Sequence, residues 1–319
     1  MHVDQESKFN RKSTPGLVDT DNSESRLGAK GSYEINSSLT AKYTLELGVN
    51  STKTDDGAGT SGRIRVRMAK IDMVSKFGTL TVGQDYTADA LANLKVDTFA
   101  GTVASGVGAD YAAYVENATT NMGILYRSRK DLVKYATPVF AGVQYSVSVD
   151  KADKRSNDPS SSNYGPTYTT HLVSFDKKMD AMTLRLQSSF THWAQASTGD
   201  NSNLHVGTVL GFGNLTFKAG WSDQESKDLA GVATDTSRMT AGFTYGMGDH
   251  TAKLAYYVTE EEVGAASEED TQISAGYEYA LHKNVTMNTI VSLLEHTDST
   301  DTTKNNEATV VSVGAVVKF

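Results

Sequence analysis

The stretch GRIRVRMAK, residues 62–70, sets arginines and apolar residues at alternate positions. The arginines are Arg63, Arg65 and Arg67, and the apolar residues between them are Ile64, Val66 and Met68. Successive side chains of a β-strand point to opposite faces, so a strand here carries all three guanidinium groups on one face. Burying three charged groups side by side in a dry core is too costly. We therefore expect the arginine face to be in contact with water.

The same period of two recurs along the whole chain. In LTAKYTLELGV, residues 39–49, the apolar side chains fall on one face and Thr, Lys and Glu on the other. Similar alternation occurs at 25–35, 182–190, 214–221, 237–245, 251–258, 271–279 and 308–319, and the polar faces often carry Gly and Ser. No comparable stretch has the helical period of 3.6. The pattern predicts an all-β protein.

Composition narrows the class of protein. The chain has 319 residues, no cysteine and a formal net charge of -8. The negative charge argues against a nucleic-acid partner, and the lack of cysteine excludes a disulfide framework. No run of about 18 apolar residues is present, which excludes transmembrane helices. A membrane β-barrel remains compatible, because its strands expose only every second residue to lipid.

Connections of two kinds alternate between the expected strands. Short turns (NSS, SKFG, TPVFAG, MDAM, GN, GD and HKN) alternate with long acidic segments such as STKTDDGAGTS and TEEEVGAASEED. This order is typical of an up-and-down meander, which must close or leave two exposed edges. We expect fifteen strands between residue 23 and Phe319, and a sixteenth, incomplete first strand within residues 1–22.

Aromatic residues decide between a soluble sandwich and a membrane barrel, since both can alternate. They cluster near the ends of the expected strands: Tyr33, Tyr43, Phe190, Trp221, Tyr245, Tyr256, Tyr279 and Phe319. Aromatic girdles and the segregation of short and long connections are typical of outer-membrane barrels. We therefore predict a transmembrane antiparallel up-and-down β-barrel of 16 strands, as one domain over residues 1–319.

Several stretches resemble the general diffusion porins of the Gram-negative outer membrane. They are SRLGAKGSYEINSSLTAKYTLELG at 25–48, FGTLTVGQDY at 77–86, VKYATPVFAGVQYSVSV at 133–149, and the terminal VVSVGAVVKF. The resemblance runs from about residue 23 to 319. It implies a homotrimer in the outer membrane of a Gram-negative bacterium, in contact with lipid and lipopolysaccharide. It also implies passive diffusion of ions and small hydrophilic solutes through a charged constriction.

The resemblance also implies roles for particular residues. Arg26 matches a wall arginine of the family, Arg127 and Arg129 fall near another, and Gln84 stands where the family commonly has arginine. With the alternation, the expected basic wall is Arg26, Lys30, Lys42, Arg63, Arg65, Arg67, Arg127 and Arg129. The third long loop, about residues 87–120, should fold into the lumen with the acids Asp89, Asp97, Asp110 and Glu116. Phe319 resembles the family's signal for membrane insertion.

Other chemistry is weakly marked. The seven histidines form no HxH or HExxH pattern, so we predict no metal site, and no motif marks a nucleophile with its base. We expect no enzymatic activity and no cofactor. The acidic runs 260–262 and 268–270 flank an outer loop, either solvated or bridged by divalent cations to lipopolysaccharide phosphate.

Two alternatives to a general pore stay open. The first is a substrate-specific channel, for which inward aromatics would be expected, and Trp193 and Tyr257 have the phase of the polar face. The second is a structural or adhesive surface barrel whose lumen is incidental.

Overall fold

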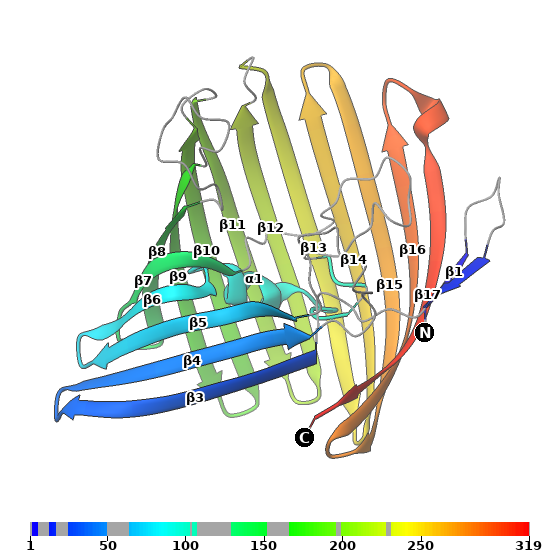
Figure 1. The fold of residues 1–319 in the computed structure, drawn as a ribbon. Helices are drawn as coiled ribbons and strands as arrows, with labels where there is room; N and C mark the ends of the chain where they lie inside the picture. The colour runs from blue at the N-terminus through cyan, green and yellow to red at the C-terminus, as the bar shows by residue number, and fades with distance from the viewer. Residues whose placement is uncertain are drawn as a thin grey trace.

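The protein is described by a computed structural model that covers residues 2–5, 13–16, 25–49, 64–102, 104–106, 129–151, 166–195, 199–227 and 231–318. The predicted site residues Arg63, Asp110, Glu116, Arg127 and Phe319 lie outside these described residues. The described chain forms an antiparallel sheet that curves around a short helix, α1 (Figure 1).

The sheet consists mainly of long strands. The strands are β1 (His2–Gln5), β2 (Ser13–Gly16), β3 (Ser25–Asn36), β4 (Leu39–Val49), β5 (Ile64–Ser75), β6 (Gly78–Tyr86), β7 (Arg129–Ala136), β8 (Val143–Lys151), β9 (Thr167–Met179), β10 (Met182–Gln195), β11 (Gly199–Phe212), β12 (Leu215–Lys227), β13 (Ala233–Met247), β14 (His250–Val263), β15 (Ala266–His282), β16 (Val285–Asp298) and β17 (Asn306–Val317). The helices are α1 (Ala90–Val96) and the single-turn η3 (Thr302–Lys304). No helix in the described part of the chain is long and apolar enough to cross a membrane.

Each strand from β3 to β17 pairs antiparallel with its neighbours in sequence, so the predicted meander of fifteen strands is confirmed. The last strand also finds a partner near the start of the chain. β17 pairs with the four-residue strand β1, which pairs in turn with β2. The described strand beside β17 has four residues, and residues 1 and 6–12 lie outside the described part, so the incomplete first strand stays a prediction.

Short turns join the strands at one end of the sheet, as predicted. The turns at 213–214 and 248–249 each begin with a glycine of positive φ, 56° at Gly213 and 63° at Gly248. Two-residue hairpin turns need this backbone conformation, because their twist then matches that of the strands. The sequence pairs GN and GD thus fix the register of β11 with β12 and of β13 with β14.

One predicted long loop is instead a continuous hairpin. The segment TEEEVGAASEED was expected to be an outer loop, but β14 runs to Val263 and β15 begins at Ala266. Gly264, at a φ of 64°, allows the tight turn between them. Glu261 therefore stands directly opposite Glu268. The prediction failed because backbone pairing can continue through a polar, charged segment once the turn permits it.

The two faces of the sheet have the reverse of a soluble protein's polarity. The face toward α1, here called the inner face, buries polar side chains that include Ser189, His205, Ser222, Gln272, Ser274 and Ser292. The opposite, outer face exposes large apolar side chains, with Leu293 at 52% and Ile273 at 48%. An exposed apolar band around a polar interior requires an apolar medium outside it. The period of two in the sequence arises because successive side chains face the polar interior and the apolar medium in turn.

A β-bulge at Arg67 changes the phase of β5. Leu47 of β4 pairs with Val66, and Glu46 pairs with Met68, so Arg67 is the extra residue between them. Before the bulge Arg65 lies on the inner face, and after it the even-numbered residues do. The prediction that Met68 faces outward is therefore wrong. The bulge also puts Lys70 and Asp72 inside, with Ile71 exposed outside.

Candidate functional site

The segment between β6 and β7 leaves the sheet and lies within its curve. Its described part, residues 87–102 and 104–106, includes α1, which packs beside β11 and β12 (Figure 1). Hydrogen bonds from this segment reach strands β8, β10, β12, β14 and β15. We call residues 87–106 the inner loop.

Asp97 is the main anchor of the inner loop. Its side chain is 0% exposed and accepts hydrogen bonds from Tyr257 Oη at 2.5 Å, Ser105 Oγ at 2.5 Å and the Phe99 N–H at 2.9 Å. Lys218 Nζ donates to the Asp97 main-chain oxygen at 2.8 Å. Burial raises the pKa of the Asp97 carboxyl, and the three donors and Lys218 oppose that rise. Asp97 thus ties the loop to β12 and β14.

Asp89 anchors the other end of the inner loop. It accepts from Thr87 Oγ1 at 2.9 Å, from Asn93 Nδ2 at 3.3 Å and from Ser189 Oγ of β10 at 3.4 Å. The Ala88 N–H donates to Ser148 Oγ of β8 at 3.0 Å. Asp89 and Asp97 were expected to face the arginines of the early strands. Instead, both buried carboxylates bind the wall behind the loop.

Three glycines of that wall make room for the inner loop. A Cβ added to Gly207 would lie 2.7 Å from Val96 Cγ1, one on Gly242 would lie 2.4 Å from Thr98 Oγ1, and one on Gly276 would lie 2.5 Å from Phe99 Cε1. These glycines belong to β11, β13 and β15. The loop therefore sits closer to the sheet than any side chain would allow. Glycines on the polar face were visible in the sequence, but nothing showed that they formed one seat.

The inner faces of β3, β4 and β5 carry most of the predicted basic wall. Arg67 is 2% exposed, and its Nε donates to Glu46 Oε1 at 2.8 Å. Arg26 Nε lies 3.9 Å from the same oxygen. Arg65, Lys30 and Lys42 share this face and are exposed. One glutamate thus binds two of the arginines, while the exposed cations meet the lumen water.

A second charged cluster continues onto β6 and β7. Asp85 Oδ2 accepts Lys70 Nζ at 3.1 Å and Lys134 Nζ at 2.6 Å, and Lys70 also lies 3.2 Å from Asp72. Since Asp85 is buried, these contacts fix the two lysines against the strands. This cluster is built from paired charges.

The strand register places Arg129 and Gln84 on the outer face. Arg129 is opposite Tyr86, donates to Tyr86 Oη at 3.0 Å and lies over its ring. Lys130 has the inner phase instead, opposite Asp85. This differs from the predicted place of Arg129 in the basic wall. Gln84 pairs with Ala69 and donates to the Val66 carbonyl. An arginine at position 84 would not have faced the lumen.

The two inward aromatics that the sequence singled out are both structural. Tyr257 is 0% exposed and is bound to Asp97. Trp193 is 9% exposed and stacks on Tyr168, with ring centroids 5.3 Å apart. Neither ring lines open space, so they do not form an aromatic path for a substrate. Among the described residues, no three His, Asp or Glu side chains gather to hold a metal ion.

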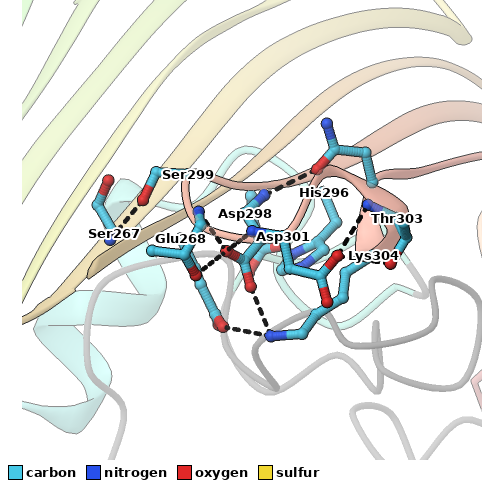
Figure 2. A network of polar contacts seen from close by, with 11 residues as sticks. Ser267, Glu268, His296, Asp298, Ser299, Asp301, Thr303 and Lys304 are labelled. Carbon is cyan, nitrogen blue, oxygen red and sulfur yellow. Dashed lines mark hydrogen bonds and ion pairs between the residues drawn. The ribbon is translucent and has the colours of Figure 1, made fainter.

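The outer ends of β15 and β16 are fastened to η3 by a polar network (Figure 2). Asp298 Oδ1 accepts from Thr300 N at 2.7 Å and Asp301 N at 2.9 Å, and its Oδ2 accepts from Lys304 Nζ at 2.6 Å. The hydrogen bond to Asp298 raises the pKa of Lys304. Two acids of the second acidic run, Glu268 and Asp270, are also engaged. Glu268 lies 3.9 Å from Lys304, and Asp270 binds the buried ring of His296 at 2.7 Å.

Comparison with known proteins gives the fold and the family. Three solved structures share the fold. The anion-selective porin from Comamonas acidovorans has a TM-score of 0.74 at 19% identity, covering 100% of this chain and 96% of that one. OmpF of Salmonella typhi, in complex with daunomycin, has 0.67 at 15%, covering 98% and 94%. OmpT of Vibrio cholerae in its trimer form has 0.62 at 14%, covering 98% and 96%.

Sequence comparison identifies the family, which similarity of fold alone does not show. No curated protein sequence matches the chain. The family described as Gram-negative porin matches it over residues 1–315. This family consists of channels and not of enzymes. The chain therefore belongs to the Gram-negative porin family, and it is an outer-membrane channel through which small solutes diffuse.

Proposed function

We propose that the inner loop and the basic inner face of β3–β5 together form a charged constriction within a single barrel domain. The observation that carries this proposal is the buried Asp97, which holds the loop inside the curve of the sheet. A fixed loop narrows the path, so solutes pass according to size. The loop is expected to extend to about residue 120, beyond the described part.

The charges on β3–β5 favour anions in this constriction. Its inner-face cations are Arg26, Lys30, Lys42, Arg65, Arg67 and Lys70, and its acids are Glu34, Glu46 and Asp72. Cations thus outnumber acids in these described strands, and a narrow low-dielectric passage strengthens their field. The fold is shared with a porin that is anion-selective. A salt gradient across a planar bilayer tests the proposal, since an anion-preferring reversal potential supports it and a cation-preferring one contradicts it.

We propose that the channel works as a homotrimer. The support is the family resemblance, the trimer form of OmpT, and a broad outer face of exposed apolar side chains. Native mass measurement in mild detergent should give three chains per particle. A particle of one chain, in detergent that preserves channel activity, would contradict this prediction. The resemblance to general porins also implies that the segment 51–61 contacts a neighbouring subunit, and this segment lies outside the described residues.

Replacing Gly276 with valine should disturb the seat of the inner loop. The new side chain would collide with Phe99, which is 1% exposed and has no room to turn away. Overpacking of this kind costs about 1–3 kcal/mol. The loop should move toward the lumen, so we expect a lower thermal unfolding midpoint and a lower single-channel conductance.

Gly246→Val is the matched control for Gly276→Val. An added Cβ at Gly246 would meet only the Asn214 oxygen, at 3.9 Å. The control also adds a valine to a strand, so it reports any general effect of the substitution. Equal conductance in the two variants would show that the glycine seat does not position the loop.

A further inference from the structure

A cavity of about 730 Å³ lies between α1 and strands β9, β10, β11 and β12. It borders the part of β9 and β10 that approaches the short turn at 180–181. In porins the short turns face the periplasm and the long loops face outward. The cavity is therefore on the periplasmic side of the inner loop, away from the basic face of β3–β5.

The lining of this cavity is strongly cationic. Its charged residues are Lys95 of α1, Lys177 and Lys178 of β9, Arg185 of β10 and Lys218 of β12, with Asp176 of β9 as the acid. Lys177 pairs with Leu184 and has the outer phase, so four of these cations face one carboxylate. The alternation of β9 gives Lys178 the inner phase, which it shares with Asp176.

Only one of these cations is neutralised within the cavity. Arg185 donates to both carboxylate oxygens of Asp176, from Nε at 2.5 Å and from Nη2. Lys218 donates to the main-chain carbonyl of Asp97 and not to a carboxylate. Among the described residues, neither Lys95 nor Lys178 has a carboxylate within ion-pair distance. Burial, followed by repulsion from Arg185, lowers the pKa of Lys95, which fits a crowded positive site.

We propose that this cavity binds a small multivalent oxyanion, of the class of phosphate-bearing solutes, as it passes the constriction. The volume is within the range of small-molecule pockets, roughly 300–1,000 Å³. Lysine ammonium groups form short, charge-assisted hydrogen bonds to phosphate oxygens. A multivalent anion satisfies several lysines at once, which chloride cannot do. The inference rests on the proposed function, since the ligand reaches the cavity through the channel.

Calorimetric titration of pyrophosphate into the purified, detergent-solubilised channel tests this site directly. The variant is the double substitution Lys95→Gln and Lys178→Gln, which removes two cations and keeps polar side chains that are one atom shorter. We expect wild type to bind pyrophosphate and the double variant to bind at least about tenfold more weakly. Lys283→Gln is the control, because it removes a cation from another short turn, at 283–284, outside the cavity.

The outcomes separate this site from the channel itself. Weak binding in the double variant only, with normal binding in Lys283→Gln, supports the site. No binding by wild type, or equal binding by all three proteins, overturns it. Thermal unfolding confirms that each variant is folded. Calorimetry does not depend on conduction, so a separate loss of bilayer conductance or anion preference would count against the proposed function and not against the site.

Discussion

Asp97→Ala should release the inner loop and make the open channel noisy. The substitution removes three hydrogen bonds in a buried place, those from Tyr257, Ser105 and the Phe99 N–H. A hydrogen bond to a charged group contributes about 1.5–3 kcal/mol, so loss of about 3 kcal/mol or more in the docking of the loop is expected. Single-channel recording should show larger fluctuations of the open current and a loss of size selection for neutral solutes.

Asp97→Asn provides the contrast. It keeps the shape of the side chain and an oxygen that can accept, so the loop should remain docked more firmly than in Asp97→Ala. If both variants keep the quiet current of wild type, Asp97 does not hold the loop, and the proposed constriction loses its anchor.

The pH dependence of this anchor has a definite sign. Burial raises the pKa of Asp97 in the docked loop above its value in an exposed loop. The docked loop therefore holds the proton more readily, so docking is strongest below the usual carboxyl pKa and weakens as pH rises through the raised value. Current noise should fall on acidification in wild type. Asp97→Asn does not titrate and should lack this component.

The sequence was most informative where two faces meet two different media. In β10 to β17 the polar residues occupy the inner phase, as Ser189, His205 and Gln272 show, and large apolar residues occupy the outer phase. Lipid on one side and water on the other select the residue type at each position. The two-residue turns fix the register between the strands that they join. The fifteen strands from residue 23 onward and their antiparallel order could therefore be predicted without knowing any contact between residues distant in sequence.

The site was harder to predict because it depends on contacts between distant residues. Tyr257 and Asp97 are separated by 160 positions, and neither has a local motif that points to the other. The bulge at Arg67 did leave a local sign. The odd-numbered positions are arginines up to Arg67 and apolar at Ile71 and Met73, so the phase must change between them. The alternation of residues 63–67 does not continue to Met68, which is why the prediction for Met68 is wrong.

The arginines of β5 should have separable effects on ion preference and on stability. Arg65 is exposed on the inner face, so Arg65→Ala should mainly weaken the positive field in the lumen. One unit charge at about 6 Å in water acts on a passing ion with about 0.7 kcal/mol, which is about a threefold change in permeability ratio. We expect the reversal potential in a salt gradient to shift toward cations, by the amount that corresponds to this change in permeability ratio. The unfolding midpoint should be unchanged.

Arg67→Ala should behave differently, because Arg67 is buried and bound to Glu46. Its removal leaves Glu46 with Arg26, whose Nε is 3.9 Å from the carboxylate oxygen. Breaking a fully buried ion pair from one side costs about 3–5 kcal/mol, and the cost here should be smaller because Glu46 is partly exposed and keeps Arg26 nearby. We therefore expect a lower unfolding midpoint in Arg67→Ala, and also in the double variant Arg65→Ala with Arg67→Ala.

A double-mutant cycle separates the two roles. Removing Glu46 together with Arg67 takes away the carboxylate that has lost its partner. The double variant Glu46→Ala with Arg67→Ala should therefore recover much of the stability lost by Arg67→Ala alone. Guanidinium groups stay charged at all working pH, so neither result should depend on pH through the arginines. The basic face would be excluded as the source of ion preference if Arg65→Ala left the reversal potential unchanged while Arg67→Ala still lowered the unfolding midpoint. In that case the arginines would serve only to hold β4 and β5 together.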